Sequence, residues 1–297
     1  MVPHIHSPAR ANARRLLAVL GLSIAILVIE LVGGFASNSL ALLADAGHVF
    51  TDVAGLSLAL LAIWFGSRPT SSERTFGYLR LEILAAVANA VLLFAVAGFI
   101  LYEAWRRLSD PPEVASSLML AVAVVGLAGN GIALWLLHDV QRRSLTMRGA
   151  YLEVAGDAAG SVAVIVAAVV IAVTGRTGAD ALASALIALL ILPRTWGLLR
   201  DAIDVLLEAT PKGVEMADVR QHILDAPGVA DVHGLHAWSI TSGVNVVSAH
   251  VVLDPGAEPA GVLDFLCECL SGDFDIEHST FQLESSDRRR LEAGSHG

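Results

Sequence analysis

Two pairs of ionisable residues, each pair spaced four apart, interrupt otherwise apolar stretches of the chain. His48 and Asp52 form the first pair, and Glu153 and Asp157 form the second. Residues four apart stack on one face of a helix, with Cβ atoms about 5–6 Å apart. If the two faces meet, one imidazole and three carboxylates converge, and such a set suits a divalent cation. We therefore predict a metal site between these two segments.

The apolar surroundings make these side chains expensive to bury. An Asp at the centre of a membrane helix costs about 2.5–3.5 kcal/mol on insertion scales, so it needs a partner, a water-filled cavity or a function. Polar contact between helices is the alternative explanation, but it would not favour acids in both pairs. Asp45, three residues before His48, either lies at the mouth of the site or caps its polar face. Gly156 and Gly160 predict that another backbone approaches closely there.

The elements that carry these residues are predicted to span a membrane. The chain is 55% hydrophobic and 16% charged, with a mean hydropathy of +0.65, which excludes an ordinary soluble protein. A bilayer core of about 30 Å requires about 20 apolar residues per helix. Six such spans are predicted, near residues 16–35, 40–65, 83–102, 118–137, 151–174 and 179–199. Pro193 and Arg194 interrupt the last one.

Arginine placement predicts the orientation of the spans, because short loops rich in Arg and Lys stay in the cytoplasm. With the N-terminus inside, nine arginines of the N-terminal segment and loops lie in the cytoplasm and three lie outside. An even number of spans returns the chain to the same side. We therefore expect an integral membrane protein, in the cell (inner) membrane, with both termini cytoplasmic.

Four motifs, in this order, resemble the cation diffusion facilitator family of divalent-metal exporters. They are ALLADAGHVFTD at 41–52, TFGYLRLEILAA at 75–86, MRGAYLEVAGD at 147–157 and VHGLHAW at 232–238. The resemblance runs from residue 16 to about residue 284 and implies a transport site on the second and fifth helices. His48, Asp52 and Asp157 match the ligand positions of that family, whereas Glu153 stands where zinc-selective relatives usually carry His.

The segment after residue 209 differs from the rest in charge and in pattern. Residues 209–284 hold twelve acids and two bases, so the whole formal net charge of -10 lies there. This acidity argues against nucleic acid or an anionic lipid surface as its partner. Predicted elements follow the order αββαβ, with helices at 214–224 and 262–270 and strands at 232–240, 244–253 and 276–283. The resemblance implies a ferredoxin-like cytoplasmic domain that forms a homodimer.

Histidines of this domain suggest a second metal site. Alternation along the strand places His250 on the face opposite Val247 and Val251. If the exposed faces of neighbouring strands coincide, His233, His250 and His278 could share a metal ion, and the resemblance implies metal at comparable positions. Ordinary surface or interface histidines are the alternative.

These observations predict divalent-metal efflux by proton antiport. With His48 neutral, the empty site carries charge -3 and the loaded site -1, so metal binding competes with protons. Zn²⁺ is expected first, since imidazole and carboxylate both bind it. The carboxylate of Glu153 hardens the set and favours Mn²⁺, Fe²⁺ or Co²⁺ as the alternatives. Alternating access of the bundle around the site would then move the ion outward.

A membrane-tethered metal sensor or scaffold that carries no ion is the rival interpretation. We do not expect an enzyme, because the sequence contains no HExxH pattern, nucleophile elbow or phosphate-binding glycine loop. No cofactor is expected besides the transported ion. The expected segments are a cytoplasmic N-terminal segment at 1–15, a six-helix transport domain at 16–208, the cytoplasmic domain at 209–284 and a disordered tail at 285–297.

Overall fold

The computed structural model describes residues 7–66, 70–139, 145–276 and 278–288. The chain divides into two compact units, each made of two segments of sequence. The first contains Met1–Leu58 and Ala88–Leu198, and the second contains Ala59–Val87 and Leu199–Gly297. The predicted limits of the N-terminal segment and of the tail fall partly outside the described residues, so they remain predictions.

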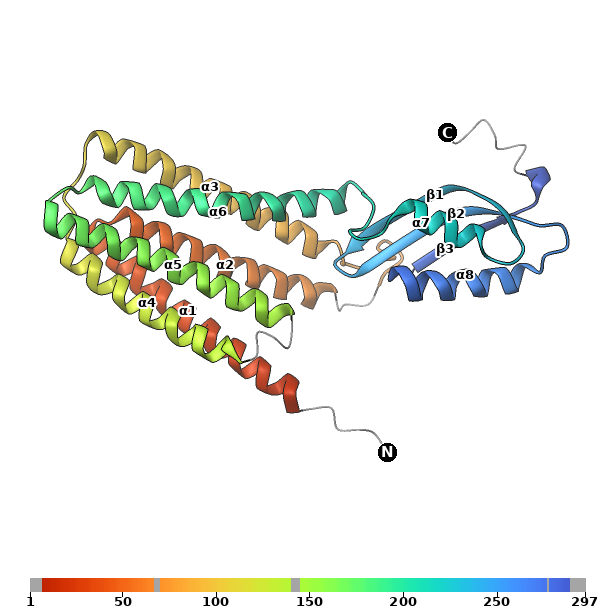
Figure 1. Cartoon of the computed structure of the whole chain (residues 1–297), viewed down its shortest axis with the longest axis horizontal. Helices are drawn as coiled ribbons and strands as arrows, with labels where there is room; N and C mark the ends of the chain where they lie inside the picture. The colour runs from red at the N-terminus through yellow and green to blue at the C-terminus, as the bar shows by residue number, and fades with distance from the viewer. Residues whose placement is uncertain (1–6, 67–69, 140–144, 277, 289–297) are drawn as a thin grey trace. The chain divides into compact units, whose positions relative to one another are not determined.

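Six long helices account for most of the described chain up to residue 206 (Figure 1). They are α1 (Ser7–Ser37), α2 (Leu40–Gly66), α3 (Leu81–Ser109), α4 (Ser116–His138), α5 (Leu145–Thr174) and α6 (Gly178–Leu206). Each predicted span falls within one of them, and α6 continues through Pro193. Over the described residues, the length and hydropathy needed to cross a bilayer are met by α1, α3, α4, α5 and α6. The 27 residues of α2 make it the sixth long helix.

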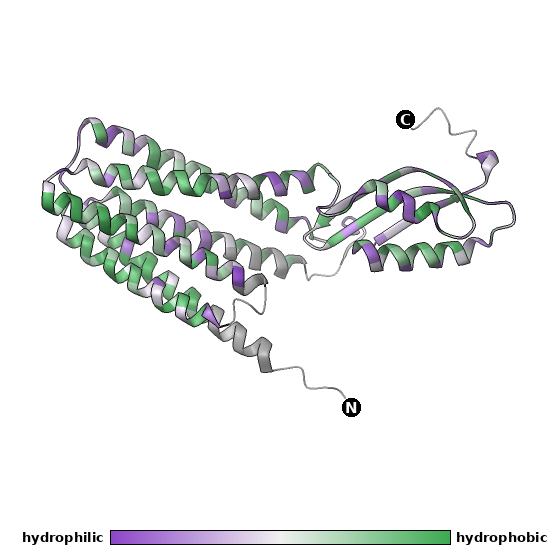
Figure 2. Cartoon of the chain, viewed as in Figure 1, coloured by the Kyte–Doolittle hydropathy of each residue, from purple (hydrophilic) through white to green (hydrophobic). Residues whose placement is uncertain are grey.

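Small residues let the helices of the first unit pack closely. Ala41 and Ala44 of α2, Ala97 of α3 and Ala168 of α5 are fully buried in one core, as expected where helices associate through close van der Waals contact. Large apolar side chains instead point outward: Phe35, Trp135 and Val173 are 74%, 76% and 80% exposed. Figure 2 shows apolar residues over most of the length of these helices. An apolar exterior of this kind suits lipid, so the predicted class of membrane protein is confirmed.

Asp180 at the start of α6 fixes the start of α2. Its carboxylate accepts hydrogen bonds from the Ser39 hydroxyl at 2.6 Å and from the backbone N–H groups of Leu40 and Ala41 at 2.7 and 3.1 Å. The first N–H groups of a helix lack partners within the helix, and an acid at that end also suits the helix dipole. The buried carboxylate therefore acts as a cap supplied by another helix, and it sets the position of the helix that carries His48.

The second unit contains a three-stranded sheet with two helices. Its elements are α7 (Met216–Leu224), β1 (Val229–Thr241), β2 (Val244–Leu253), α8 (Pro259–Phe274) and β3 (His278–Glu284). β1 pairs with β2 antiparallel, and β2 pairs with β3 parallel. Ile223 of α7 and Leu266 of α8 are buried against Val247 and Val251 of β2. The predicted αββαβ order of an α+β domain is confirmed.

The same unit contains the loop and helix end before residue 88. Arg80 donates to Glu208 at 2.8 Å, and the Thr241 hydroxyl donates to Glu82 at 2.5 Å. These contacts join residues 70–87 to the chain after residue 199. The compact unit is therefore larger than the segment 209–284 that composition singled out, and the limits of that segment remain a prediction.

Candidate metal centre

Three of the four predicted ligands converge in the first unit. His48 and Asp52 lie on α2, one helical turn apart, and Asp157 lies on α5. The Nε2 atom of His48 is 3.5 Å from Asp52 Oδ2 and 3.7 Å from Asp157 Oδ1. Each residue offers a ligand atom within 4.8 Å of the other two. We call these three residues the metal cluster.

The metal cluster is buried and its polar atoms are poorly satisfied. The side chains of His48, Asp52 and Asp157 are 13%, 21% and 8% exposed. Within the described part of the chain, His48 Nδ1, Asp52 Oδ2 and Asp157 Oδ1 are buried without a hydrogen-bond partner. Buried polar atoms are costly unless something binds them. A cation between the three side chains would satisfy the two carboxylates, and imidazole plus carboxylate is a donor set that divalent transition metals accept.

Glu153, the fourth predicted ligand, lies beside this group rather than within it. Its Oε1 is 3.5 Å from the guanidinium of Arg194 on α6, and its side chain is 34% exposed. Glu153 is nevertheless close enough for its charge to act on His48 and Asp52. The sequence singled out Arg194 only as an interruption of the last span, and its pairing with Glu153 appears only in the structure.

Asp45 lies inside the bundle rather than at its surface. It is 2% exposed, and its Oδ2 accepts a hydrogen bond from the Ser161 hydroxyl of α5 at 3.4 Å. A Cβ added at Gly160 would lie 2.6 Å from Asp45 Oδ1, whereas one added at Gly156 would meet nothing within 4 Å. Only one glycine of the predicted GxxxG pair is therefore required, and it makes room for a carboxylate rather than for a backbone.

Glu30 of α1 is a buried acid that the sequence analysis did not single out as functional. It is 1% exposed, and its Oε2 has no hydrogen-bond partner among the residues that the structure describes. An ionisable residue within an apolar span was the available signal, because such residues are rare in membrane helices and mark ion pathways. The sequence gives Glu30 no partner at helical spacing, and only the packing of α1 reveals its neighbours.

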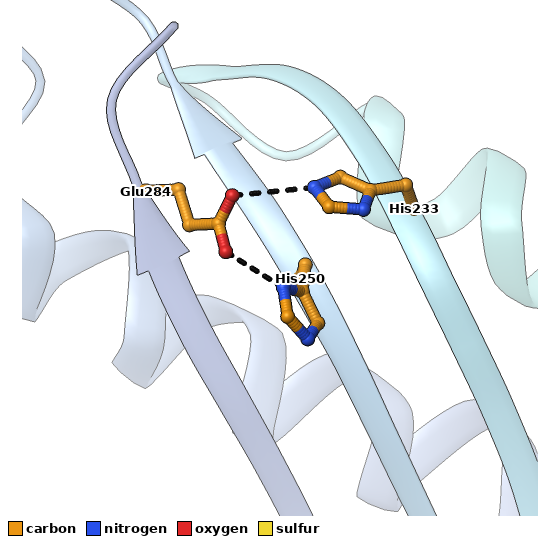
Figure 3. Close-up of side chains that lie close together, drawn as sticks. All are labelled: His233, His250 and Glu284. Atoms are coloured by element: carbon orange, nitrogen blue, oxygen red, sulfur yellow. Dashed lines mark hydrogen bonds and ion pairs between the residues drawn. The ribbon is translucent and has the colours of Figure 1, made fainter. Parts of the chain in front are cut away.

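A second cluster lies on the sheet of the other unit (Figure 3). Glu284 of β3 points between His233 of β1 and His250 of β2, with its Oε2 3.3 Å from His233 Nε2 and its Oε1 2.6 Å from His250 Nδ1. The two imidazole rings are 4.9 Å apart at their centroids. The side chain of Glu284 is 1% exposed. These three residues form the sheet cluster, which also offers ligand atoms within 4.8 Å of one another.

The predicted third member of this site, His278, is not brought to the other two histidines. The parallel register pairs His278 with Val246 and Glu284 with Val252, so His278 lies at the opposite end of β3 from Glu284. Its ring instead lies 6.3 Å from that of Phe76. His278 and Glu284 do lie on the same face of β3, because side chains alternate along a strand and these two positions are an even number of residues apart. Register along the strand decided which of them meets His233 and His250.

Hydrogen bonds determine the charge state of Glu284. Burial opposes its charged form, but hydrogen bonds and charge from His250 and His233 outweigh this and lower the pKa of the Glu284 carboxyl below its ordinary value. Glu284 is therefore ionised at neutral pH. A carboxylate and two imidazoles form a ligand set that Zn²⁺ accepts, with room in its coordination for a further ligand.

Comparison with known proteins identifies the group to which this molecule belongs. The family description "Cation efflux transmembrane domain" matches residues 16–207, and "Cation efflux protein, cytoplasmic domain" matches residues 211–286. The chain belongs to the cation efflux family. The cation efflux family is one of membrane transporters, not of enzymes, and it is the one that the sequence motifs predicted.

Several relatives in this family match over nearly the whole chain. "Cation efflux system protein CzcD" of Alcaligenes sp. (strain CT14) is 45% identical over 99% of this chain and 93% of its own. "Zinc transporter ZitB" of Escherichia coli (strain K12) is 42% identical over 94% and 90%. "Cadmium, cobalt and zinc/H(+)-K(+) antiporter" of Bacillus velezensis (strain DSM 23117 / BGSC 10A6 / LMG 26770 / FZB42) is 39% identical over 95% and 92%. Their names describe cation efflux, zinc transport and the antiport of cadmium, cobalt and zinc.

Proposed function

We propose that this protein exports a divalent metal ion, Zn²⁺ first, from the cytoplasm in exchange for protons. The observation that carries the proposal is the metal cluster of His48, Asp52 and Asp157, which brings three ligand atoms from two helices within 4.8 Å of one another. Buried ionisable groups in a membrane helix are costly unless they serve an ion. Alternating access to the cluster from the two sides of the bundle then moves the ion.

Zinc is the preferred cargo because the cluster combines one imidazole with carboxylates. Names of relatives support this choice, since one is called a zinc transporter and another names cadmium, cobalt and zinc. Glu153 lies close enough to join as a fourth ligand if it leaves Arg194, and four ligands suit the tetrahedral preference of Zn²⁺. With Glu153 as a ligand, three carboxylates would surround the ion, and this harder ligand set would also bind Mn²⁺, Fe²⁺ or Co²⁺.

Protons are the exchanged ions in this proposal, because metal and proton compete for the same atoms. Imidazole nitrogen and carboxylate oxygen must be free of protons to bind the metal, so loading releases protons and reprotonation releases the metal. One relative is named as an antiporter of metal against H⁺ and K⁺. Such competition makes the direction of transport follow the proton gradient.

We extend the proposal to the location and the assembly of the protein. The protein lies in the cell (inner) membrane with both termini cytoplasmic, and the segment 209–284 forms the cytoplasmic domain. That domain forms a homodimer and binds a regulatory metal at the sheet cluster of His233, His250 and Glu284. The description of the matched family domain as cytoplasmic supports this placement.

Transport by reconstituted protein tests the proposal. The full-length chain is placed in proteoliposomes with a zinc-sensitive dye inside, and Zn²⁺ entry is measured under an imposed pH gradient. We expect Asp157→Asn to reduce the flux by at least about 100-fold, because it removes a ligand from the proposed transport site, a loss worth about 2.7 kcal/mol or more. Asp110→Asn, at an exposed acid after α3, is the matched control.

Two results would contradict the proposal. Wild-type protein that binds Zn²⁺ but carries none under any gradient would favour a membrane-tethered sensor. Flux that is unchanged in both Asp157→Asn and Asp52→Asn would exclude the metal cluster as the transport site.

A further inference from the structure

A second group of polar side chains lies in the first unit, apart from the metal cluster. It consists of Glu30 on α1, Asp45 on α2, Asn130 on α4 and Ser161 on α5, and we call it the oxygen pocket. These residues are 1%, 2%, 4% and 1% exposed. Four helices therefore each contribute one buried polar side chain to one region of the bundle, where lipid or apolar packing would be the default.

Contacts within the oxygen pocket are loose. Ser161 Oγ is 3.4 Å from Asp45 Oδ2, and Asn130 Nδ2 is 3.4 Å from Ser161 Oγ. Both distances exceed the common values of about 2.7–3.0 Å. Gly126 of α4 lies between two of these side chains. A Cβ atom added to it would lie 2.7 Å from Glu30 Oε1 and 3.5 Å from Ser161 Oγ. Glu30 thus points toward Ser161, across a glycine that leaves the space open.

The two carboxylates of the pocket lack a cationic partner. Glu30 Oε2 is buried with no hydrogen-bond partner, and neither Glu30 nor Asp45 forms an ion pair with any Lys, Arg or His that the structure describes. The charged groups that act on Glu30 are Asp45 and Asp157, both acids. Repulsion between buried acids is relieved only by a cation or a proton.

We propose that the oxygen pocket is a second cation site, which binds a monovalent cation that takes part in the exchange beside the protons that compete at the metal cluster; this inference rests on the proposed exchange. Its oxygen donors are two carboxylates and the Ser161 hydroxyl, while Asn130 directs its amide nitrogen to that hydroxyl. Oxygen donors of this kind select hard cations, in contrast to the imidazole of His48. The shared chemistry is a monovalent cation on oxygen, either an alkali ion or a proton.

Spacing within the pocket argues against a small divalent ion. Mg²⁺ holds its ligands at about 2.0–2.1 Å in an octahedron, which places adjacent oxygens about 2.9 Å apart. The Ser161 and Asp45 oxygens are 3.4 Å apart, a spacing that suits a larger ion.

Coupling to the metal cluster follows from electrostatics. The charge of Asp157, a member of the metal cluster, acts on Glu30. A cation bound between Glu30 and Asp45 therefore weakens the attraction of Asp157 for a metal ion, and a bound metal weakens the pocket equally. This reciprocal competition is what an exchanger requires, because one ion must leave as the other enters.

Binding can be measured without transport. Full-length protein in detergent, freed of divalent metal with a chelator, is unfolded by heat in KCl, in NaCl and in N-methylglucamine chloride at equal ionic strength. An alkali ion in the pocket should raise the unfolding midpoint of wild type and of Ser184→Ala, a matched buried serine on α6. The increase should vanish in Glu30→Gln and Asp45→Asn. Ser161→Ala, a smaller change that keeps both acids, should lower the apparent alkali affinity at least threefold.

Transport identifies the source of the cation. Proteoliposomes are given an alkali gradient at constant pH, or a pH gradient in N-methylglucamine. Metal flux driven by the first supports an alkali ion, and flux driven only by the second supports a proton. In either case Glu30→Gln should reduce the driven flux at least tenfold, and its Zn²⁺ affinity should no longer depend on the monovalent cation in solution.

Three outcomes would overturn the inference. The first is that Glu30→Gln and Asp45→Asn both carry metal under either gradient as fast as wild type does. The second is loss of one bound Zn²⁺ per chain in those variants, which would make the pocket a divalent site. The third is a wild type that neither transports metal nor gains stability from alkali ions. If wild type carries no metal but its alkali stabilisation disappears in Glu30→Gln, the exchange fails as a function and the pocket stands as a binding site.

Discussion

Arg194 of α6 lies 3.5 Å from a carboxylate oxygen of Glu153 on α5. Glu153 is the position where resemblance to zinc-selective relatives implied His, so this chain combines an acid there with a permanent cation. A guanidinium does not lose its proton in proteins, so the pairing is independent of pH. The guanidinium holds one oxygen of the Glu153 carboxylate and neutralises part of its charge, so Arg194 competes with an incoming metal ion for Glu153.

Removing this competitor should tighten metal binding. We expect Arg194→Gln to increase the Zn²⁺ affinity about two- to fivefold, a small effect because the Arg194 and Glu153 side chains are 53% and 34% exposed and such pairs contribute about 0–1 kcal/mol. Competition with a chromogenic chelator measures the affinity of the purified chain. Arg200→Gln, at an arginine of the same helix that is 73% exposed, should change nothing. An equal gain in the Glu153→Gln background would show that Arg194 does not act through Glu153.

Replacing Glu153 with His should shift selectivity toward zinc. Glu153→His adds a nitrogen ligand that Zn²⁺ favours over Mn²⁺ and removes the ion pair with Arg194. We expect the ratio of Zn²⁺ to Mn²⁺ transport to rise about tenfold, or about 1.4 kcal/mol, in proteoliposomes offered both metals. Glu153→Gln, which loses the carboxylate without gaining imidazole, is the control. Unchanged selectivity in Glu153→His would mean that this position does not face the transported ion.

Glu284 should hold the three strands together near the sheet cluster. Glu284→Gln replaces a carboxylate that faces two imidazoles, and losing charged hydrogen bonds costs about 1.5–3 kcal/mol. Because the folded pKa of Glu284 lies below its ordinary value of 4.5, this stabilisation is complete above that value and is lost as the pH falls through the folded pKa. Hydrogen–deuterium exchange of β1 to β3 in the metal-free full-length chain should be faster in Glu284→Gln at pH 7. Near pH 3 the difference from wild type should shrink, and a constant difference would contradict the assigned charge.

Gly234 should be required for the position of His250. It has φ +56, and a Cβ there would lie 3.3 Å from His250 Cδ2. Gly234→Ala should cost about 1–2 kcal/mol through the left-handed backbone and should also weaken Zn²⁺ binding to the sheet cluster. Gly243 has φ +74 with nothing within 4 Å of a Cβ, so Gly243→Ala should cost similar stability without changing zinc affinity. If both variants changed zinc binding equally, the methyl group added in Gly234→Ala would not be displacing the ring of His250.

Local pattern was sufficient for most of the architecture. Long apolar runs predict membrane helices because lipid offers no hydrogen bonds to the backbone, and alternation predicts strands because side chains point to opposite faces. The pair of His48 and Asp52 was predictable for the same reason, since spacing of four within one helix places both residues on one face.

Pairings between distant elements were not accessible to the same reasoning. The partner of Glu153 is Arg194, and Glu284 rather than His278 meets His233 and His250, because helix packing and strand register decide which positions face each other. Glu30 illustrates the limit most clearly: as a lone acid in an apolar run it has no partner at helical spacing, yet the bundle places it beside Gly126 and toward Ser161. The sequence by itself determined the helices, the strands and the two halves of a metal cluster, since these depend on neighbours along the chain. Only the tertiary structure decided which buried charges share a space, because that depends on how separate elements pack.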